Sequence, residues 1–265
     1  MIDIDKIYNE DCLEGMKRIP SGSVDAIICD LPYEVLNKGN KCAQWDVVIP
    51  FDKLREQYER VIKDNGAICL FCQGMFTAKL MTSNSKLWRY NLVWDKMRAT
   101  GFLNAYKMPL RYHEDIAIFY KQLPTYNPQM EALNGRERSH PQGKGVHAET
   151  NRCYGDLNRK QLYEPKYENL DKKFPRSIIS IKREHDNMQF HPTQKPVELL
   201  EYLIKTYTNR DDVVLDNCMG SGTTAIACLH THRHFIGFET NKEYFDLSQE
   251  RIRQELMRPS FDFSD

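Results

Sequence analysis

Short apolar runs alternate with amphipathic stretches along most of this 265-residue chain. A buried strand forms a continuous apolar run, whereas a surface helix places apolar residues about three or four positions apart. By these criteria we expect strands at 4–8, 24–29, 66–72, 212–216 and 235–239, and helices at 13–19, 51–63, 76–84, 197–207, 223–230 and 242–257. The alternation of strands with helices in both halves of the chain predicts a mainly parallel α/β sheet.

Two segments depart from this alternation. Apolar runs at 88–94 and 115–120, joined across 101–112, are predicted to form an antiparallel pair of strands. After Lys121 the apolar periodicity fades, and Pro, Gly, Asn, Arg and His dominate until about Arg176. A structureless loop of that length is unusual in a compact domain unless it is functional, so we expect an inserted recognition region. A disordered surface insertion is the alternative.

The composition limits the class of protein. Lys and Arg (37) balance Asp and Glu (37), so the whole chain is not a polycation. No apolar run reaches the roughly 18 residues that a spanning helix needs, and the acidic, mixed N-terminus is unlike a secretory signal. We therefore expect no membrane segment, a cytoplasmic location and reduced cysteines. Cys69 and Cys72 form a CxxC pair, but they face opposite sides of a predicted strand, which favours core packing over a metal site.

A glycine-rich loop lies between the predicted strand at 212–216 and the predicted helix at 223–230. This strand–loop–helix unit places a ligand at a helix N-terminus, where free backbone amides suit a carboxylate. Gly220 and Gly222 have no Cβ and are expected to let the ligand approach the backbone. Hydroxyl donors in the loop are Ser221, Thr223 and Thr224.

Two features limit which ligand this loop can bind. A phosphate-binding loop needs a lysine before its Ser or Thr, whereas Gly222 directly precedes Thr223, which argues against a nucleoside triphosphatase. Glu239 ends the next predicted strand, 17 residues beyond Gly222, where an acidic residue commonly binds two ribose hydroxyls. An ordinary carboxylate at a helix start is the alternative for Glu239.

The sequence Asp30-Leu31-Pro32-Tyr33 closes the apolar run at 24–29. Asp30 and the carbonyl of Leu31 can accept hydrogen bonds from the two protons of an aromatic amine, which frees the nitrogen lone pair for attack. Pro32 fixes its φ angle and stiffens the turn, so both acceptors are preorganised. Tyr33 offers a face on which an extruded base can stack. The alternative is a simple strand-ending turn, and the glycine loop elsewhere in the chain argues against it.

These motifs resemble those of the amino-methylating DNA methyltransferases. Residues 30–33 are similar to the (D/N/S)PP(Y/F) catalytic motif of that family, and 216–224 are similar to its DPFxGSGTT cofactor motif. Residues 191–196, HPTQKP, match a further family segment. The catalytic motif comes first and the cofactor motif last, with a variable region between them, which is the order of the β-class enzymes.

The resemblance implies the architecture. The fold class is then α/β, a Rossmann-like S-adenosylmethionine-dependent methyltransferase fold, circularly permuted, with a mixed, mostly parallel sheet and an inserted target-recognition region. The catalytic half is expected at 1–121, the target-recognition region at 122–185 and the cofactor-binding half at 186–265. The implied cofactor is S-adenosyl-L-methionine, and no metal is expected.

The resemblance also implies roles for single residues. The implied catalytic residues are Asp30, Leu31, Pro32 and Tyr33. The implied cofactor-binding residues are Asp11, Cys12, Thr193, Lys195, Asp216, Met219, Gly220, Ser221, Gly222, Thr223 and Glu239. Within this set, Asp11 is expected to approach the cofactor adenine, and Thr193 and Lys195 its methionine end. Segments 94–96 and 113–121 resemble family strands beside the target-base pocket.

Three residues depart from the family pattern. Leu31 stands at the usual first proline, and because a carbonyl performs its role, activity is expected to survive. Asn217 and Cys218 replace a Pro-Phe pair whose ring commonly abuts the cofactor, which predicts weaker cofactor binding. Aspartate at the head of the catalytic motif favours adenine over cytosine by family habit.

The predicted function is site-specific methylation of the N6 amino group of a flipped adenine in double-stranded DNA. Methylation of the cytosine N4 amino group is the first alternative. A catalytically silent nucleic-acid-binding module is the second, and the intact Asp30 and Tyr33 argue against it. RNA and protein-glutamine methyltransferases usually have the reverse motif order. The family further implies a homodimer and a cognate restriction enzyme as partners.

Overall fold

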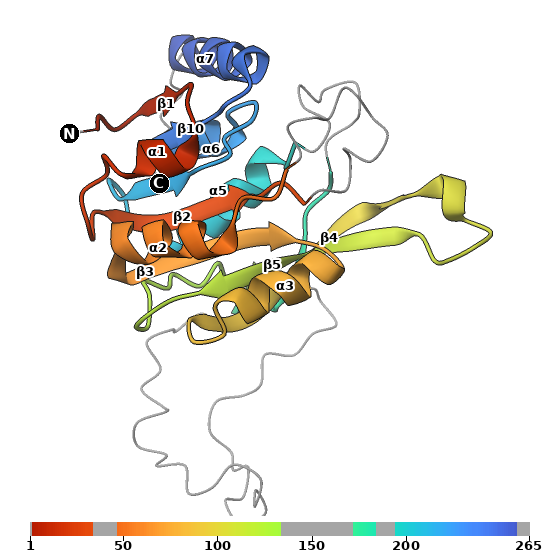
Figure 1. Ribbon diagram of the computed structural model, residues 1–265. Coiled ribbons are helices and arrows are strands. Elements are labelled where there is room, and N and C mark those ends of the chain that lie inside the picture. Colours follow the sequence, from red (N-terminus) through yellow and green to blue (C-terminus); the bar gives the residue numbers. More distant parts are fainter. Residues whose placement is uncertain (1, 34–46, 134–171, 184–193, 259–265) are drawn as a thin grey trace, which may run out of the picture. The chain divides into compact units, whose positions relative to one another are not determined.

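The computed structural model describes residues 2–33, 47–133, 172–183 and 194–258. The chain forms two compact units, one made of Met1–Asn127 with Ser177–Asp265 and the other of Pro128–Arg176. The strands of the first unit are β1 (Lys6–Tyr8), β2 (Val24–Asp30), β3 (Ile62–Cys72), β4 (Trp88–Thr100), β5 (Arg111–Phe119), β8 (Ile178–Ser180), β9 (Val213–Asp216) and β10 (His234–Phe238). In the described part of the chain they form one sheet, in the order β1-β10-β9-β2-β3-β5-β4-β8 (Figure 1).

The sheet is mixed and mostly parallel, as the sequence predicts. The successive pairs from β1 through β10, β9 and β2 to β3 are all parallel, and β4 pairs in parallel with β8. Strand β5 is antiparallel to both β3 and β4, which confirms the predicted antiparallel pair. The sheet includes β8, so Ile178–Ser180, which lies within the predicted insertion, belongs to the main sheet.

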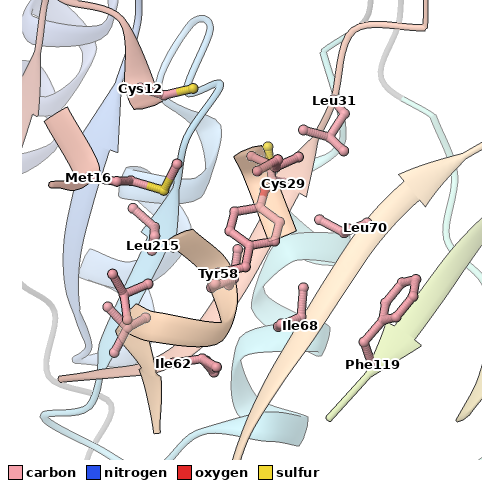
Figure 2. Close-up of a cluster of buried hydrophobic side chains, with 14 of the residues drawn as sticks. Cys12, Met16, Cys29, Leu31, Tyr58, Ile62, Ile68, Leu70, Phe119 and Leu215 are labelled. Carbon is pink, nitrogen blue, oxygen red and sulfur yellow. The ribbon is translucent and has the colours of Figure 1, made fainter. Parts of the chain in front are cut away.

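Helices cover both faces of the sheet. They are α1 (Cys12–Met16), α2 (Phe51–Val61), α3 (Met75–Ser83), α5 (Val197–Tyr207), α6 (Thr223–Thr231) and α7 (Lys242–Met257). One apolar cluster contains Met16 of α1, Tyr58 of α2 and Phe76 of α3, and Figure 2 shows Met16 and Tyr58 within it. The second cluster contains the apolar stripe of α5 together with buried residues of α6 and partly buried residues of α7. The sheet therefore has a separate core on each face.

The two clusters explain the paired cysteines. Cys69 packs in the cluster below α5 and α6, whereas Cys72 packs with α1 to α3. This confirms that the CxxC pair faces opposite sides of β3, because successive side chains alternate across a strand. Each thiol is buried in apolar surroundings, which raises the pKa of Cys72 to about 11.

In the second unit, β6 (Glu131–Ala132) pairs antiparallel with β7 (Lys172–Lys173). Lys173 Nζ lies 3.5 Å from Glu131 Oε2 across this pair. Residues 134–171, most of the predicted target-recognition region, lie outside the described residues. Among the helices of the described residues, none has the length and apolar character needed to cross a bilayer.

Candidate active site

A cavity of about 580 Å³ lies at the carboxyl ends of β2, β9 and β10, where open α/β sheets bind their ligands. Its walls include both predicted motifs, although these lie about 190 residues apart in the sequence. The sequence-predicted residues that line it are Asp11, Cys12, Asp30, Leu31, Pro32, Tyr33, Lys195, Asp216, Met219, Gly220, Ser221, Thr223 and Glu239. Thr193 lies outside the described residues.

The glycine loop is tied to the end of β9 by Asp216. This buried carboxylate accepts hydrogen bonds from Thr224 Oγ1 at 2.5 Å and from the Cys218 amide at 3.0 Å. The two bonds hold both ends of the loop against the strand that precedes it. Burial raises the pKa of Asp216 to about 6. Asp216 therefore fixes the conformation of the glycine loop through these two hydrogen bonds.

The two loop glycines have different roles. Gly220 lines the cavity at φ +53°, and a Cβ added there would meet open space. Gly222 is the N-cap of α6 at φ +82°, and a Cβ there would lie 2.9 Å from Ser248 Cβ of α7. Both positions require the left-handed conformation that glycine adopts readily. Gly222 is absent from the cavity lining, so what approaches its backbone is helix α7 rather than the cavity.

Ser221 is buried and already engaged. Its hydroxyl donates to Gln194 Oε1 at 3.0 Å, and Arg251 Nη1 donates to its carbonyl at 2.6 Å. Gln194 precedes Lys195, so this contact fixes the start of α5 against the glycine loop. Sequence reasoning missed Gln194, although it lies inside the HPTQKP segment.

Two acidic groups lie on the cavity wall beside β10 and α1. Glu239 accepts hydrogen bonds from the Gly220 amide and the Asn241 amide, both at 2.8 Å, and burial raises its pKa. Asp11 is the N-cap of α1 and accepts from the Leu13 amide at 2.8 Å. A carboxylate has about four acceptor positions, so each group retains capacity to bind a hydroxyl or an amine.

Asp30 ends β2 and faces the same cavity. Tyr33 donates its hydroxyl to Asp30 Oδ1 at 2.6 Å, and Lys195 Nζ lies 2.5 Å from Asp30 Oδ2. Burial raises the pKa of Asp30, while Lys195 opposes that rise. The ring of Tyr33 packs on Phe76, with centroids 4.7 Å apart. Tyr33 therefore orients the carboxylate as well as presenting a ring at the cavity.

A second acid shares the same lysine. Lys195 Nζ lies 3.4 Å from Glu114 Oε2, and Lys96 Nζ lies 3.3 Å from Glu114 Oε1. Burial raises the pKa of Glu114, but the two ammonium groups outweigh burial and hold it below its usual value. Lys195 is likewise subject to burial, which lowers its pKa, yet Asp30 and Glu114 raise it overall. All four side chains line the cavity, two acids and two bases in one network.

The sequence indicated only some members of this network. Glu114 and Lys96 lie in the two segments that resemble strands beside the target-base pocket, but nothing in the sequence pairs them with Lys195. The resemblance places Lys195 at the methionine end of the cofactor, and in the structure Lys195 forms ion pairs with the carboxylates of Asp30 and Glu114. Among the replaced loop residues, Asn217 Oδ1 accepts from the buried Tyr58 hydroxyl of α2.

A sequence model of DNA methylases, the N6/N4 type, matches residues 24–250. The chain belongs to this family. The match covers both motifs and most of the described sheet, and it confirms the predicted family and DNA methyltransferase activity class. The cofactor of the family, S-adenosyl-L-methionine, agrees with the predicted one.

Individual relatives agree with the assignment. Type II methyltransferase M.HpaI of Haemophilus parainfluenzae is 28% identical, over 95% of this chain and 75% of the relative. DNA adenine methyltransferase YhdJ of Escherichia coli is 27% identical, over 93% of this chain and 82% of the relative. The M1.HpyAVI–SAM complex superimposes with a TM-score of 0.60 at 25% identity, over 93% of this chain and 98% of that one. The cytosine-N4-specific PvuII DNA methyltransferase superimposes with a TM-score of 0.63 at 15% identity, over 94% and 90%, and shares the fold.

The cavity suits this cofactor. Its volume of about 580 Å³ lies within the range of small-ligand sites. Asp11 and Glu239 line the cavity, and both carboxylates retain the capacity to accept hydrogen bonds from hydroxyl and amino groups of the cofactor. The N-terminus of α6 lies beside Gly220 and Thr223, where backbone amides suit a carboxylate.

Proposed function

We propose that this protein transfers the methyl group of S-adenosyl-L-methionine to the N6 amino group of an adenine flipped out of double-stranded DNA. The observation that carries the proposal is that Asp30 and the glycine loop line one cavity. Family membership supports DNA as the substrate. The relative YhdJ, whose name specifies adenine, and the aspartate at the head of the motif support adenine over cytosine.

The acceptor side of the reaction belongs to Asp30 and Leu31. The Asp30 carboxylate and the Leu31 carbonyl accept hydrogen bonds from the two amino protons, which directs the nitrogen lone pair away from the purine ring. When bound, S-adenosyl-L-methionine supplies an electrophilic methyl group on a sulfonium. Transfer of that methyl group to the amino nitrogen would leave a neutral thioether, and the Asp30 carboxylate would accept the proton that the nitrogen loses. Preorganised acceptors lower the barrier because they need no rearrangement during the transfer.

The donor side belongs to the glycine loop and its neighbours. Glu239 and Asp11 are proposed to bind ribose and adenine groups of the cofactor, and the first turn of α6 its carboxylate. Lys195 holds Asp30 until the target amino group arrives. The homodimer and the cognate restriction enzyme that the family resemblance implies stay predictions.

The proposal is tested on DNA from a host that lacks N6-methyladenine. The host expresses the wild type or Asp30→Ala, and its DNA is digested to nucleosides and analysed by mass spectrometry. We expect N6-methyladenine with the wild type and none with Asp30→Ala. Because Lys195 keeps Glu114 as a partner in that variant, cofactor affinity by calorimetry is expected to stay within about threefold of the wild type.

Other outcomes are informative. N4-methylcytosine alone would transfer the proposal to cytosine. The absence of both modified bases would refute DNA amino methylation, and full activity of Asp30→Ala would refute the role of the carboxylate. Single-molecule sequencing of the same DNA gives the recognition sequence.

A further inference from the structure

The hairpin of β4 and β5 ends in an exposed apolar tip. Figure 1 shows this hairpin extending past α3, beyond the rest of the sheet. Leu103 is 97% exposed and Tyr106 is fully exposed. Phe102 and Met108 are the other exposed apolar residues of the tip, and Tyr112 at the start of β5 is also exposed. Such a concentration on a projecting element marks an interaction surface, because single apolar residues on a surface are ordinary but clusters are not.

The tip has its own internal structure. Gly101 turns the chain with φ +86°, and the 3₁₀ turn η2 (Phe102–Asn104) follows. The Asn104 amide donates to the Gly101 carbonyl at 2.9 Å, and the Lys107 and Met108 amides donate to the Asn104 carbonyl at 2.8 and 3.0 Å. These bonds hold the apolar side chains on a compact turn, which limits the entropy lost when a partner binds.

The base of the same hairpin lines the candidate active site. Trp94, Lys96 and Thr100 of β4 and Arg111 and Glu114 of β5 are all cavity residues. Thr100 pairs with Arg111 at the outer end of the ladder. Since an extended chain spans at most about 3.5 Å per residue, Leu103 lies within roughly 10 Å of Thr100. A duplex that delivers a base into the cavity must therefore pass close to the tip.

The charge of the hairpin identifies the partner. Between residues 96 and 113 the chain carries Lys96, Arg98, Lys107 and Arg111 and no Asp or Glu. Lys96, at the base of the hairpin, forms an ion pair with Glu114. Two copies of such a surface repel each other, whereas a polyanion with flat, stackable bases complements both the cations and the apolar side chains.

We propose that the tip, residues 102–108, enters the DNA beside the target and fills the space that the flipped base leaves in the stack. This inference rests on the proposed DNA methylation. Extruding a base costs stacking and pairing, and apolar side chains inserted between base pairs offset that cost. Leu103 and Tyr106, the most exposed members, are assigned to the gap, and Lys107 to a neighbouring phosphate.

The main experiment compares two duplexes that carry the recognition sequence obtained from sequencing. In one the target base is paired, and in the other it lies opposite an abasic site, so that it is already unpaired. For Leu103→Ser/Tyr106→Ser we expect methylation of the paired duplex to fall about tenfold or more and methylation of the unpaired duplex to stay within about threefold. The control, Leu256→Ser/Met257→Ser, removes comparably exposed residues from the end of α7 and is expected to retain wild-type rates on both.

Three results would contradict insertion of the tip into the DNA. They are equal losses of methylation on both duplexes, no loss on either, and a wild-type dimer that becomes a monomer with the tip substitutions in sedimentation. If the wild type methylates no DNA, the proposed function fails. Binding of a labelled DNA duplex then still tests whether the tip contacts DNA. Lys107→Gln is expected to reduce the slope of log affinity against log salt for a labelled duplex by about one, and an unchanged slope would exclude the phosphate contact.

Discussion

Lys195 Nζ lies 2.5 Å from Asp30 Oδ2 and 3.4 Å from Glu114 Oε2, so a single ammonium group joins the candidate catalytic carboxylate to a second buried acid. Asp30 is a stronger hydrogen-bond acceptor for an amino group when it is ionised than when it is protonated. Burial raises the pKa of Asp30, and Lys195 limits that rise. The lysine thus sets the pH range over which the acceptor is available, and Glu114 acts on Asp30 in the opposite direction.

Replacement of Lys195 by Met is expected to move the acid limb of the kcat/KM profile to higher pH. Without the ammonium the pKa of Asp30 rises further, so at a given pH more of the enzyme holds a protonated carboxyl group, which is a weaker acceptor. The measurement is methylation of DNA at a series of pH values. Lys195→Arg keeps the charge and is expected to keep the limb near its wild-type position. A uniform loss of activity at every pH would contradict control through Asp30.

Replacement of Glu114 by Gln is expected to shift the same limb to lower pH. The Glu114 carboxylate raises the pKa of Asp30 by repulsion, so its neutralisation makes Asp30 easier to ionise. The amide oxygen can still accept from Lys96, which is 4% exposed, although the bond to a neutral group is weaker. We expect a loss of about 1–3 kcal/mol in the free energy of unfolding by urea denaturation. If the acid limb of Glu114→Gln instead moves to higher pH, as for Lys195→Met, both shifts would reflect a general disturbance of the site rather than the charge beside Asp30.

The sequence predicted the helices and strands better than the contacts between side chains. The strands and helices around the glycine loop, including α5 and α7, occur where apolar periodicity placed them, because a single burial pattern along the chain determines each. The two motifs line one cavity because the carboxyl ends of parallel strands share one edge of the sheet. These features follow from local pattern and general topology.

What the sequence did not reveal depends on packing between distant segments. Glu114 joins the site through Lys195, 81 residues away, and no local pattern encodes that contact. Gly222 carries the glycine signature of a ligand loop, yet its neighbour is Ser248 of α7. Strand β3 begins at Ile62, before the apolar run at 66–72, because pairing of Val24 with Ile62 extends it. Tertiary contacts decide such positions after local preference has been satisfied.

The two loop glycines are expected to respond differently to substitution by Ala. Gly220→Ala places a methyl group at the cavity wall, so we expect weaker cofactor binding by calorimetry with a loss in stability of about 1 kcal/mol from the left-handed backbone. Gly222→Ala places its methyl group against Ser248, so we expect a larger fall in stability, because α7 must shift. The readouts are the cofactor dissociation constant and the unfolding free energy of both variants. Equal effects on both quantities would contradict the separation of roles.

Replacement of Thr224 by Val is expected to destabilise the protein more at pH 8 than at pH 5. Thr224 Oγ1 donates to Asp216 Oδ2 at 2.5 Å, and burial raises the pKa of Asp216 to about 6. Because this folded-state pKa exceeds the ordinary value of 3.8, the group favours folding at low pH and loses that contribution as the pH rises through about 6. The variant lacks the donor that stabilises the ionised form, so its pKa is higher and its loss continues above pH 6.

We expect the difference from the wild type in urea unfolding to reach about 1–3 kcal/mol at pH 8, the cost of leaving a buried carboxylate without one of its donors. At pH 5 the carboxyl group is largely protonated in both folded proteins, so the difference should be smaller. Thr224→Ser keeps the hydroxyl group and serves as the matched control, with a gap that is small and independent of pH. A Val variant whose deficit is the same at both pH values would mean that the lost methyl and hydroxyl packing, and not the charge of Asp216, governs the stability of the glycine loop.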